Sequence, residues 1–231
     1  MKREIKKPSH IGIILDGNGR WAKNRHMPRL VGHKAGVLAI AKTIKAAIEE
    51  GIEILSVFAF STENWKRSRE EVDGIFALIS QAIDRYKEEI IKREIKVQIL
   101  GDYSVLEDDL KRKIDEIIDE TKNNKKLIFN IALNYGSRAE ILKAVNACSQ
   151  KYPGQTITEE MFEKELYTSG LPDVDFIIRT SGEQRISNFM LYQSAYAEFY
   201  FPKVFWPDFN AKFLKKALKV YSKRDRRFGK V

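Results

Sequence analysis

The residues best suited to chemistry follow a short apolar stretch near the amino terminus. Residues 11–15 read as a buried strand that ends directly at Asp16. The next four residues are Gly17, Asn18, Gly19 and Arg20. A glycine-containing turn can direct backbone N–H groups at one anion, and arginine side chains add forked donors that match phosphate oxygens. We therefore expect Asp16 and its neighbours to face a phosphorylated ligand, with ordinary ion pairing of Asp16 as the alternative.

Several familiar catalytic and binding motifs are missing. Gly17 and Gly19 are not followed by the third glycine of a dinucleotide-binding loop, and the chain has no P-loop. The sequence contains three histidines and one cysteine, Cys148, and these do not have zinc-ligand spacing. No Ser-His-Asp order and no glycosidase-like carboxylate pair is suggested. A single cysteine also excludes a disulfide framework within one chain and fits a cytoplasmic location.

Polar clusters recur after the other predicted strands. Residues 52–60, 127–133 and 174–178 are apolar runs of strand length, and residues 95–100 form a further strand. Polar clusters open at Ser61, Asn134 and Arg179, each at the carboxyl end of a strand. Parallel sheets bind ligands beyond this edge. Segments distant in sequence could therefore converge on one pocket.

The elements that position these clusters alternate regularly along the chain. Helical periodicity is found over residues 31–50, 70–92, 105–122 and 139–151, a short helix opens at residues 158–161, and Asp208 is expected to cap a last helix. Strict alternation of strands and helices predicts an α/β fold with a mostly parallel central sheet flanked by helices. We expect a single domain, residues 1–231, with a basic C-terminal tail, residues 223–231.

The helix over residues 70–92 has an unusually wide apolar stripe. It includes Val72, Ile75, Phe76, Ile79, Ile83, Tyr86 and Ile90. Packing between two neighbouring elements is the simpler interpretation, and one wall of an apolar ligand tunnel is the other. Periodicity does not separate the two.

The net charge of the chain favours anionic partners but does not by itself distinguish among them. There are 41 Lys and Arg against 32 Asp and Glu, a formal net charge of +9. This favours anionic partners: nucleic acid, a membrane surface or phosphorylated small molecules. The arginines gather after predicted strands rather than along one helix face with interleaved aromatics, so we expect no nucleic acid partner. No stretch has the length of a transmembrane helix.

Six motifs together resemble a known family. They are HIGIILDGNGRWAKNRHMPRLVGHKAG (residues 10–36), FSTENWKR (60–67), NYGSR (134–138), RTSGEQRISNFMLYQSAYAEFYF (179–201), WPDF (206–209) and RRFG (226–229). In this order they resemble the cis-prenyltransferases, and most closely the bacterial undecaprenyl diphosphate synthases. The resemblance covers nearly the whole chain. It implies a fold with an apolar product tunnel, which favours the tunnel interpretation of residues 70–92 and adds the helix of residues 37–48 as a second wall.

The resemblance also implies an activity. The family condenses farnesyl diphosphate, an allylic diphosphate, with successive isopentenyl diphosphates, forming Z double bonds and releasing pyrophosphate. Mg²⁺ is required. The product expected here is undecaprenyl diphosphate, the carrier lipid of cell-wall glycan assembly. We expect a cytoplasmic enzyme with peripheral contact at the inner face of the membrane for product release.

The resemblance assigns roles residue by residue. Asp16 is implied to hold the metal and assist departure of the diphosphate, Asn64 to assist proton removal, and Glu198 to be a second metal ligand. The allylic site would comprise Gly17, Asn18, Gly19, Arg20, Trp21, Arg29, His33, Ser61, Thr62, Glu63, Trp65 and Arg67. The isopentenyl site would comprise Arg179, Arg185, Ile186 and Ser187. Ser61, Asn64 and Trp65 have a simpler alternative, because such residues are common at helix starts and in packing.

The carboxyl-terminal tail carries a further expectation about assembly. Arg227 and Gly229 match an R-x-G element that reaches across a dimer interface toward the isopentenyl site, so a homodimer is implied. A merely solvated tail is the alternative.

A few residues depart from the family pattern. Gln184 stands where some members have a histidine, Ser68 replaces a proline, and Ser137 and Ser181 replace glycines. The rival hypothesis is a non-catalytic partner subunit of the same fold, and retention of the reacting groups argues against it.

Overall fold

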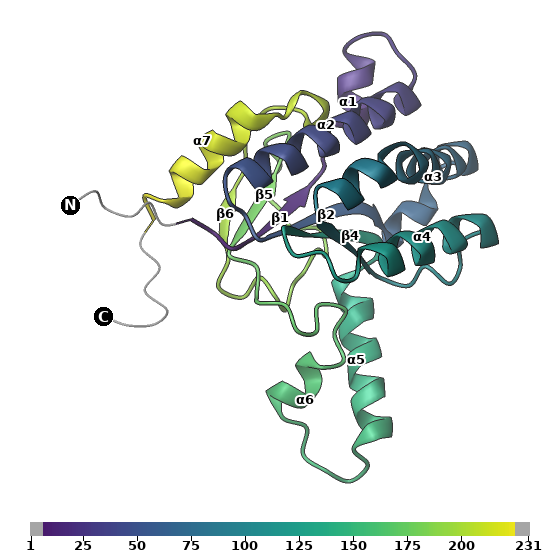
Figure 1. Cartoon of the computed structure of the whole chain (residues 1–231), viewed down its shortest axis with the longest axis vertical. Helices are drawn as coiled ribbons and strands as arrows, with labels where there is room; N and C mark the ends of the chain where they lie inside the picture. The colour runs from purple at the N-terminus through teal and green to yellow at the C-terminus, as the bar shows by residue number, and fades with distance from the viewer. Residues whose placement is uncertain (1–6, 225–231) are drawn as a thin grey trace.

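The computed structural model describes residues 7–224 and is built on a six-stranded sheet. The strands are β1 (His10–Ile14), β2 (Ile54–Ser61), β3 (Ile95–Leu100), β4 (Leu127–Tyr135), β5 (Phe176–Arg179) and β6 (Glu198–Tyr200). Their order is β3-β4-β2-β1-β5-β6, and every neighbouring pair is parallel. The predicted α/β class with a parallel central sheet is confirmed (Figure 1).

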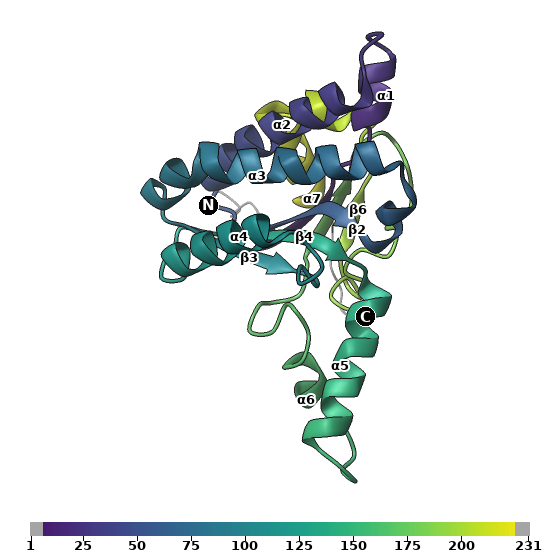
Figure 2. The same cartoon turned by 90° about the vertical axis from the view of Figure 1, so that its right-hand side faces the viewer.

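One face of the sheet is covered by long helices. These are α2 (Arg29–Glu49), α3 (Arg69–Lys92), α4 (Asp108–Thr121) and α7 (Ala211–Tyr221). Side chains of α2 and α7 form one core with the inward residues of β1, β2 and β5, whereas α3 and α4 pack on Phe60 and Leu133. Figure 2 shows α2, α3 and α4 lying along this side of the sheet.

The opposite face is covered differently. A second core joins Ile14, Leu100 and Ala132 to Phe189 and Met190 of the loop before β6. The helices α5 (Ser137–Lys151) and α6 (Glu159–Glu163) project from the body as an arm (Figures 1 and 2). Within residues 7–224, none of the helices combines the length and apolar composition that crossing a bilayer requires.

Three local expectations are corrected by the structure. The segment after Asp16 is not only a turn, because a short helix, α1 (Asn18–Lys23), starts directly after Gly17. The cap of α7 is Asn210, whose Oδ1 accepts a hydrogen bond from the backbone N–H of Lys212, and not Asp208, which lies in a 3₁₀ turn (Trp206–Asp208). β6 was not predicted, since its three residues are too few to show a strand pattern.

Two glycines of α2 let α1 pack closely against it. A side chain at Gly32 would collide with the Asn18 carbonyl oxygen, and one at Gly36 with the Asn18 Oδ1. Since β-carbons are absent at both places, the backbones of α1 and α2 come together. The residues after β1 and those at the start of α2 are thereby held in one unit.

Candidate active site

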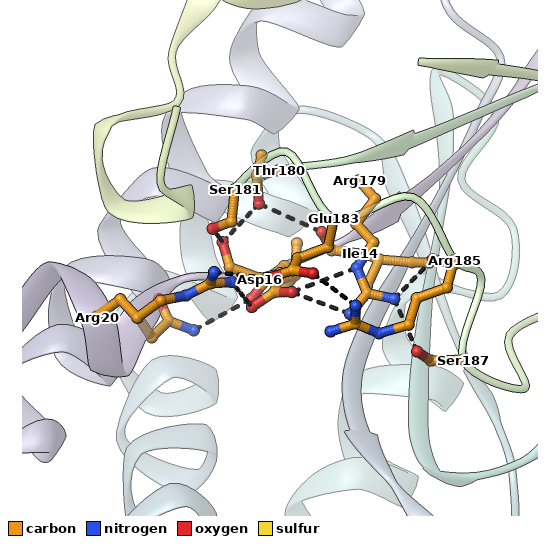
Figure 3. Close-up of polar contacts among 11 residues, drawn as sticks. Ile14, Asp16, Arg20, Arg179, Thr180, Ser181, Glu183, Arg185 and Ser187 are labelled. Carbon is orange, nitrogen blue, oxygen red and sulfur yellow. Dashed lines mark hydrogen bonds and ion pairs between the residues drawn. The ribbon is translucent and has the colours of Figure 1, made fainter. Parts of the chain in front are cut away.

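Asp16 is fixed through its backbone at the carboxyl end of β1. Its carbonyl oxygen accepts hydrogen bonds from Thr180 Oγ1 at 2.6 Å, Ser181 Oγ at 2.9 Å and the Trp206 backbone N–H at 3.0 Å. Gly17 follows with φ +110°, and a side chain there would collide with Ser181 Oγ. The backbone of Asp16 is thus locked, and its carboxylate remains for interactions in the site (Figure 3).

Arg179 holds that carboxylate from the next strand. It is the last residue of β5 and pairs in register with Ile14. The distance from Arg179 Nη2 to Asp16 Oδ2 is 2.9 Å, and Nε lies 3.3 Å from the same oxygen. On the other side, Arg179 Nη1 donates to the Arg185 carbonyl at 2.6 Å and to Ser187 Oγ at 2.7 Å. Arg179 is buried, so its donors act mainly in positioning Asp16 and the loop that carries Ser187.

Glu183 bridges two arginines at the entrance of the site. Arg20 Nη2 lies 3.0 Å from Asp16 Oδ1, and Arg20 Nη1 lies 2.7 Å from Glu183 Oε1. The other oxygen of Glu183 is 2.5 Å from Arg185 Nη1. Hydrogen bonds from Arg185 and Arg20 lower the pKa of the Glu183 carboxyl group. Arg20 and Arg185, assigned to two different diphosphates, thus share one carboxylate (Figure 3).

A second group of cationic donors surrounds Glu71. Arg29 Nε lies 3.2 Å from Glu71 Oε2, while His33 Nε2 and Arg67 Nη1 lie 3.2 Å and 3.1 Å from Glu71 Oε1. Burial lowers the pKa of His33, and Glu71 acts in the opposite direction. Arg29 and His33 belong to α2, Arg67 precedes α3, and Glu71 is in the first turn of α3. One carboxylate therefore ties the starts of two helices together.

The segment after β2 forms a capping box. The Ser61 side chain accepts from the Asn64 backbone, and the Ser61 backbone N–H donates to Asn64 Oδ1 at 3.1 Å. The expected helix-start role of Ser61 and Asn64 is therefore present. Glu63 of the same turn accepts from Asn188 Nδ2 at 2.9 Å. The cap fixes Asn64 in place and leaves its Nδ2 amide outside the capping bond.

These groups surround one polar cleft of about 1070 Å³. Of the residues expected to bind substrate, Gly17, Asn18, Gly19, Arg20, Arg29, His33, Ser61, Glu63, Arg67, Arg179, Arg185 and Ser187 line it together with the two expected catalytic residues, Asp16 and Asn64. The segments that open at Asp16, Ser61 and Arg179 thus meet at the carboxyl edge of the sheet, as expected, together with the start of α2. The expected fourth cluster, which opens at Asn134, does not line the cleft.

Four expected substrate-binding residues do not line this cleft. Trp21 Nε1 donates to Asp208 Oδ1 at 2.8 Å and so links α1 to the 3₁₀ turn. Trp65 packs on Phe60 and donates from Nε1 to Asn134 Oδ1 at 2.8 Å. Thr62 and Ile186 are likewise absent from the cleft lining, and Ile186 packs against the second core. The structure gives these side chains packing and bridging contacts.

Glu198 does not reach the cleft within one chain. Glu198 pairs in register with Phe176, and Phe176 with Ile11, so it lies at the opposite end of the sheet from Asp16. Its carboxylate accepts a hydrogen bond from Arg224. Arg227 and Gly229 lie outside the described residues.

The donor set fits a magnesium ion that depends on substrate for most of its ligands. Among residues 7–224, no group of three or more His, Cys, Asp or Glu side chains is arranged to hold a metal. Asp16 supplies one carboxylate at the edge of a cleft rich in arginine. Mg²⁺ is commonly bound through one or two carboxylates together with substrate phosphates and water, so Asp16 meets this requirement once a diphosphate is present.

A narrow apolar cavity adjoins the cleft. Its volume is about 130 Å³, and its walls include Val37, Ile40, Ala41 and Ile44 of α2, Ile79, Ala82, Ile83, Tyr86 and Ile90 of α3, and inward residues of β2, β3 and β4. Ala59 of β2 lines both spaces. Part of the wide stripe of α3 therefore lines an apolar cavity.

Sequence reasoning missed the bridging roles of Glu71 and Glu183. Glu183 lies in the motif of residues 179–201, in which only the arginines and their neighbours Ile186 and Ser187 were considered for substrate binding. Glu71 had one local signal, because it follows Arg67 by four residues across a helix start. Its contacts with Arg29 and His33 depend on how α2 and α3 meet, which the sequence does not reveal.

A cationic cleft joined to an apolar cavity defines a protein that handles a phosphorylated compound with an apolar body. A family model described as "Putative undecaprenyl diphosphate synthase" matches residues 14–229. The chain belongs to this family, and it is a prenyltransferase with the cis-prenyltransferase fold.

Individual relatives agree with this assignment. The chain is 44% identical to an isoprenyl transferase of Clostridium perfringens, covering 99% of this chain and 92% of the relative. It is 49% identical to an isoprenyl transferase of Streptococcus pyogenes, and the match covers 97% of this chain and 94% of the relative. A lavandulyl diphosphate synthase from Lavandula x intermedia, solved with dimethylallyl diphosphate, superposes with a TM-score of 0.93 at 34% identity, with 97% and 99% covered. A probable undecaprenyl diphosphate synthase from Campylobacter jejuni gives 0.82 at 34% identity, with 97% and 100% covered.

Proposed function

We propose that this prenyltransferase condenses farnesyl diphosphate with successive isopentenyl diphosphates and makes a long-chain Z-polyprenyl diphosphate. The product we propose is undecaprenyl diphosphate, the carrier lipid for cell-wall glycans. The observation that carries the proposal is the meeting of the two cavities at Ala59. A diphosphate held by the arginines would leave its hydrocarbon end beside the apolar cavity, where a growing chain can be buried away from water.

The residues of the cleft suit the departure of a diphosphate. During the reaction the allylic C–O bond breaks and its electron pair leaves with pyrophosphate, while the double bond of isopentenyl diphosphate forms the new C–C bond and a proton is lost. Negative charge grows on the leaving group. Arg20, Arg29 and Arg67 line the cleft and are suited to stabilise that charge.

Asp16 is the proposed metal ligand. Mg²⁺, when bound, would supply Lewis acidity at the leaving diphosphate. The chain's own contribution is to hold Asp16 at a fixed place through its carbonyl oxygen and through Arg179. Because this support exists without substrate, the carboxylate needs little rearrangement when a diphosphate arrives.

The second substrate is proposed to bind beside Arg179, Arg185 and Ser187. The Arg185 side chain is 58% exposed, and its contact with Glu183 can be exchanged for a phosphate oxygen. Asn64 is proposed to assist removal of the proton after bond formation. The capping box supports this role, because it fixes Asn64 at the side of the cleft that is lined by Ser61 and Arg67.

Similarity to a solved relative supports the allylic part of this proposal. The lavandulyl diphosphate synthase is described in complex with dimethylallyl diphosphate, and its fold matches this chain over nearly the full length. The chain also retains the arginines and the carboxylate that such a ligand requires. We infer that an allylic diphosphate occupies the same cleft here.

We further propose a homodimer with peripheral membrane contact. Within one chain Glu198 lies at the end of the sheet remote from Asp16. A role for Glu198 in metal binding would therefore need a second copy that brings it to the cleft. The same arrangement would allow Arg227 and Gly229 to reach the partner's isopentenyl site. Membrane contact is proposed because the product is almost entirely apolar.

The decisive experiment measures incorporation of labelled isopentenyl diphosphate onto farnesyl diphosphate, with Mg²⁺ or with a chelator, followed by chromatographic sizing of the product. We expect Mg²⁺-dependent formation of a product of undecaprenyl length. A shorter or longer product would contradict the proposed product while retaining the reaction. No incorporation by folded protein would contradict the proposal and favour a non-catalytic partner subunit.

A further inference from the structure

Glu71 occupies a distinctive place behind the cationic side of the cleft. Its side chain is 11% exposed and touches three residues, Arg29, His33 and Arg67, that line the cleft. Glu71 itself does not line it. A carboxylate in this position cannot replace a phosphate group in the cleft, but it can fix the donors that a phosphate would meet.

The geometry explains why one carboxylate is needed there. Arg29 and Arg67 carry like charges and come from different helices, and they converge on the two oxygens of Glu71. Without a shared anion they would repel each other and lose a common orientation. The Glu71 backbone N–H is also bound by Ser68 Oγ, the cap of α3, so the start of the helix holds the carboxylate in place.

We propose that Glu71 is a positioning residue for the allylic diphosphate, acting through Arg29, His33 and Arg67. This inference rests on the proposed function and adds a residue that the sequence motifs did not indicate. Its action is confined to one of the two substrates. The isopentenyl set, Arg179, Arg185 and Ser187, is instead supported by Asp16 and Glu183.

Two effects of removing the Glu71 charge oppose each other. The cleft would become more positive, which attracts an anion, but the donors would lose their orientation. The Arg29 side chain is 65% exposed, so solvent screens much of the added attraction. The His33 side chain is 14% exposed, and within residues 7–224 its hydrogen-bond partner is Glu71. Loss of orientation therefore outweighs the gain in charge.

The test compares Glu71→Gln with Glu70→Gln, a matched change at the neighbouring exposed acid of the same helix turn. For Glu71→Gln we expect the KM for farnesyl diphosphate and the Kd for inorganic pyrophosphate to rise by about tenfold, the loss typical of one well-placed charge-assisted contact. The KM for isopentenyl diphosphate should change less than about twofold, within the range of a screened surface charge. Glu70→Gln should match wild type, and Glu71→Asp should recover part of the loss.

A spectroscopic measurement separates positioning from general destabilisation. His33 faces Glu71, Arg29 and Arg67, and of these only Glu71 raises its pKa. NMR titration should show a lower His33 pKa in Glu71→Gln than in wild type, with no change in Glu70→Gln.

Three results would overturn the inference: equal rises in both KM values, tighter pyrophosphate binding in Glu71→Gln, or kinetics equal to those of Glu70→Gln. Failure of the proposed function would look different. In that case wild type itself would neither bind pyrophosphate nor incorporate isopentenyl diphosphate.

Discussion

Arg179 and Asp16 form a partly buried contact in which Nη2 and Nε of the arginine both approach Asp16 Oδ2, at 2.9 Å and 3.3 Å. The same guanidinium reaches the Arg185 carbonyl and Ser187 Oγ. It therefore connects the carboxylate proposed to bind metal with the loop proposed to bind isopentenyl diphosphate. A single side chain spans the two halves of the site.

Replacing Arg179 with lysine tests this connection. Lysine keeps the positive charge, but it lacks the planar guanidinium group that donates to Asp16 on one side and to the loop of Ser187 on the other. We expect kcat/KM to fall by about 10²-fold, the usual cost of losing a preorganised donor. Steady-state kinetics for both substrates would measure the effect. Activity within a few fold of wild type would show that charge alone is sufficient.

Replacing Asp16 with asparagine should stop turnover without unfolding the protein. The backbone of Asp16 is held by Thr180 Oγ1, Ser181 Oγ and the Trp206 N–H, and the substitution leaves these bonds intact. We expect activity to drop by at least about 10²-fold because the proposed metal ligand is lost, with thermal unfolding near that of wild type. Retained Mg²⁺-dependent activity would remove Asp16 from metal binding.

Replacing Ala59 with leucine should shorten the products. Ala59 lies where the polar cleft meets the apolar cavity, so a larger side chain would narrow the passage between them. Products would be sized by chromatography, with Ala139→Leu, at an exposed position of α5 that lines neither space, as the control. If Ala59→Leu and wild type give the same length distribution, the growing chain does not pass this point.

Buried histidine makes stability depend on pH. His10 is fully buried, with Nδ1 at 2.9 Å from the Pro172 carbonyl and Nε2 at 2.7 Å from Ser56 Oγ, and burial lowers its pKa from 6.5. The unfolded chain therefore binds a proton more readily, so stability is lost as pH falls below about 6.5. Unfolding temperatures at pH 7.5 and 5.5 would measure this loss.

The control for this pH dependence is His10→Gln, which cannot be protonated. It should be less stable than wild type at pH 7.5 but lose less on acidification. His33, whose pKa is also lowered by burial, contributes in the same direction in both proteins. An unchanged pH dependence in His10→Gln would assign the effect to other groups.

Replacing Gly32 with alanine should separate α1 from α2. In an unobstructed helix this change is stabilising, but here the new β-carbon would collide with the Asn18 carbonyl oxygen. We expect a loss of about 1–3 kcal/mol in unfolding free energy, typical of an overpacked site. Denaturant unfolding would measure it, with Lys34→Ala as an exposed control on the same helix. A more stable Gly32→Ala would contradict the close packing.

The sequence was most informative where periodicity and chain order decide the structure. The parallel sheet followed from alternating strands and helices, and the cleft followed from polar residues placed after Asp16, Ser61 and Arg179. The short helix after Gly17 was missed because two glycines in four residues look like a turn. β6 was missed because hydrogen bonds to β5, rather than local pattern, define its three residues.

The residues that support the site were harder to predict than those that line it. Glu71 meets Arg29 and His33 only because α2 and α3 lie beside each other, and no motif records that contact. Trp21 and Trp65 have motif positions that suggest substrate binding, and within one chain their indole N–H groups donate to Asp208 and Asn134. Motifs indicate chemistry, whereas tertiary contacts decide which side chains face the ligand.

α2 has a consequence for the direction in which a bound molecule can extend. Its first turns carry Arg29 and His33, and later turns carry Val37, Ala41 and Ile44 on the apolar wall. From Arg29 to Ile44 the helix rises about 22 Å. A diphosphate held at Arg29 and His33, as proposed, would direct its apolar part along this axis. Because each condensation adds its isoprene unit at the diphosphate end, every addition in the proposed reaction would push the far end of the chain farther along α2.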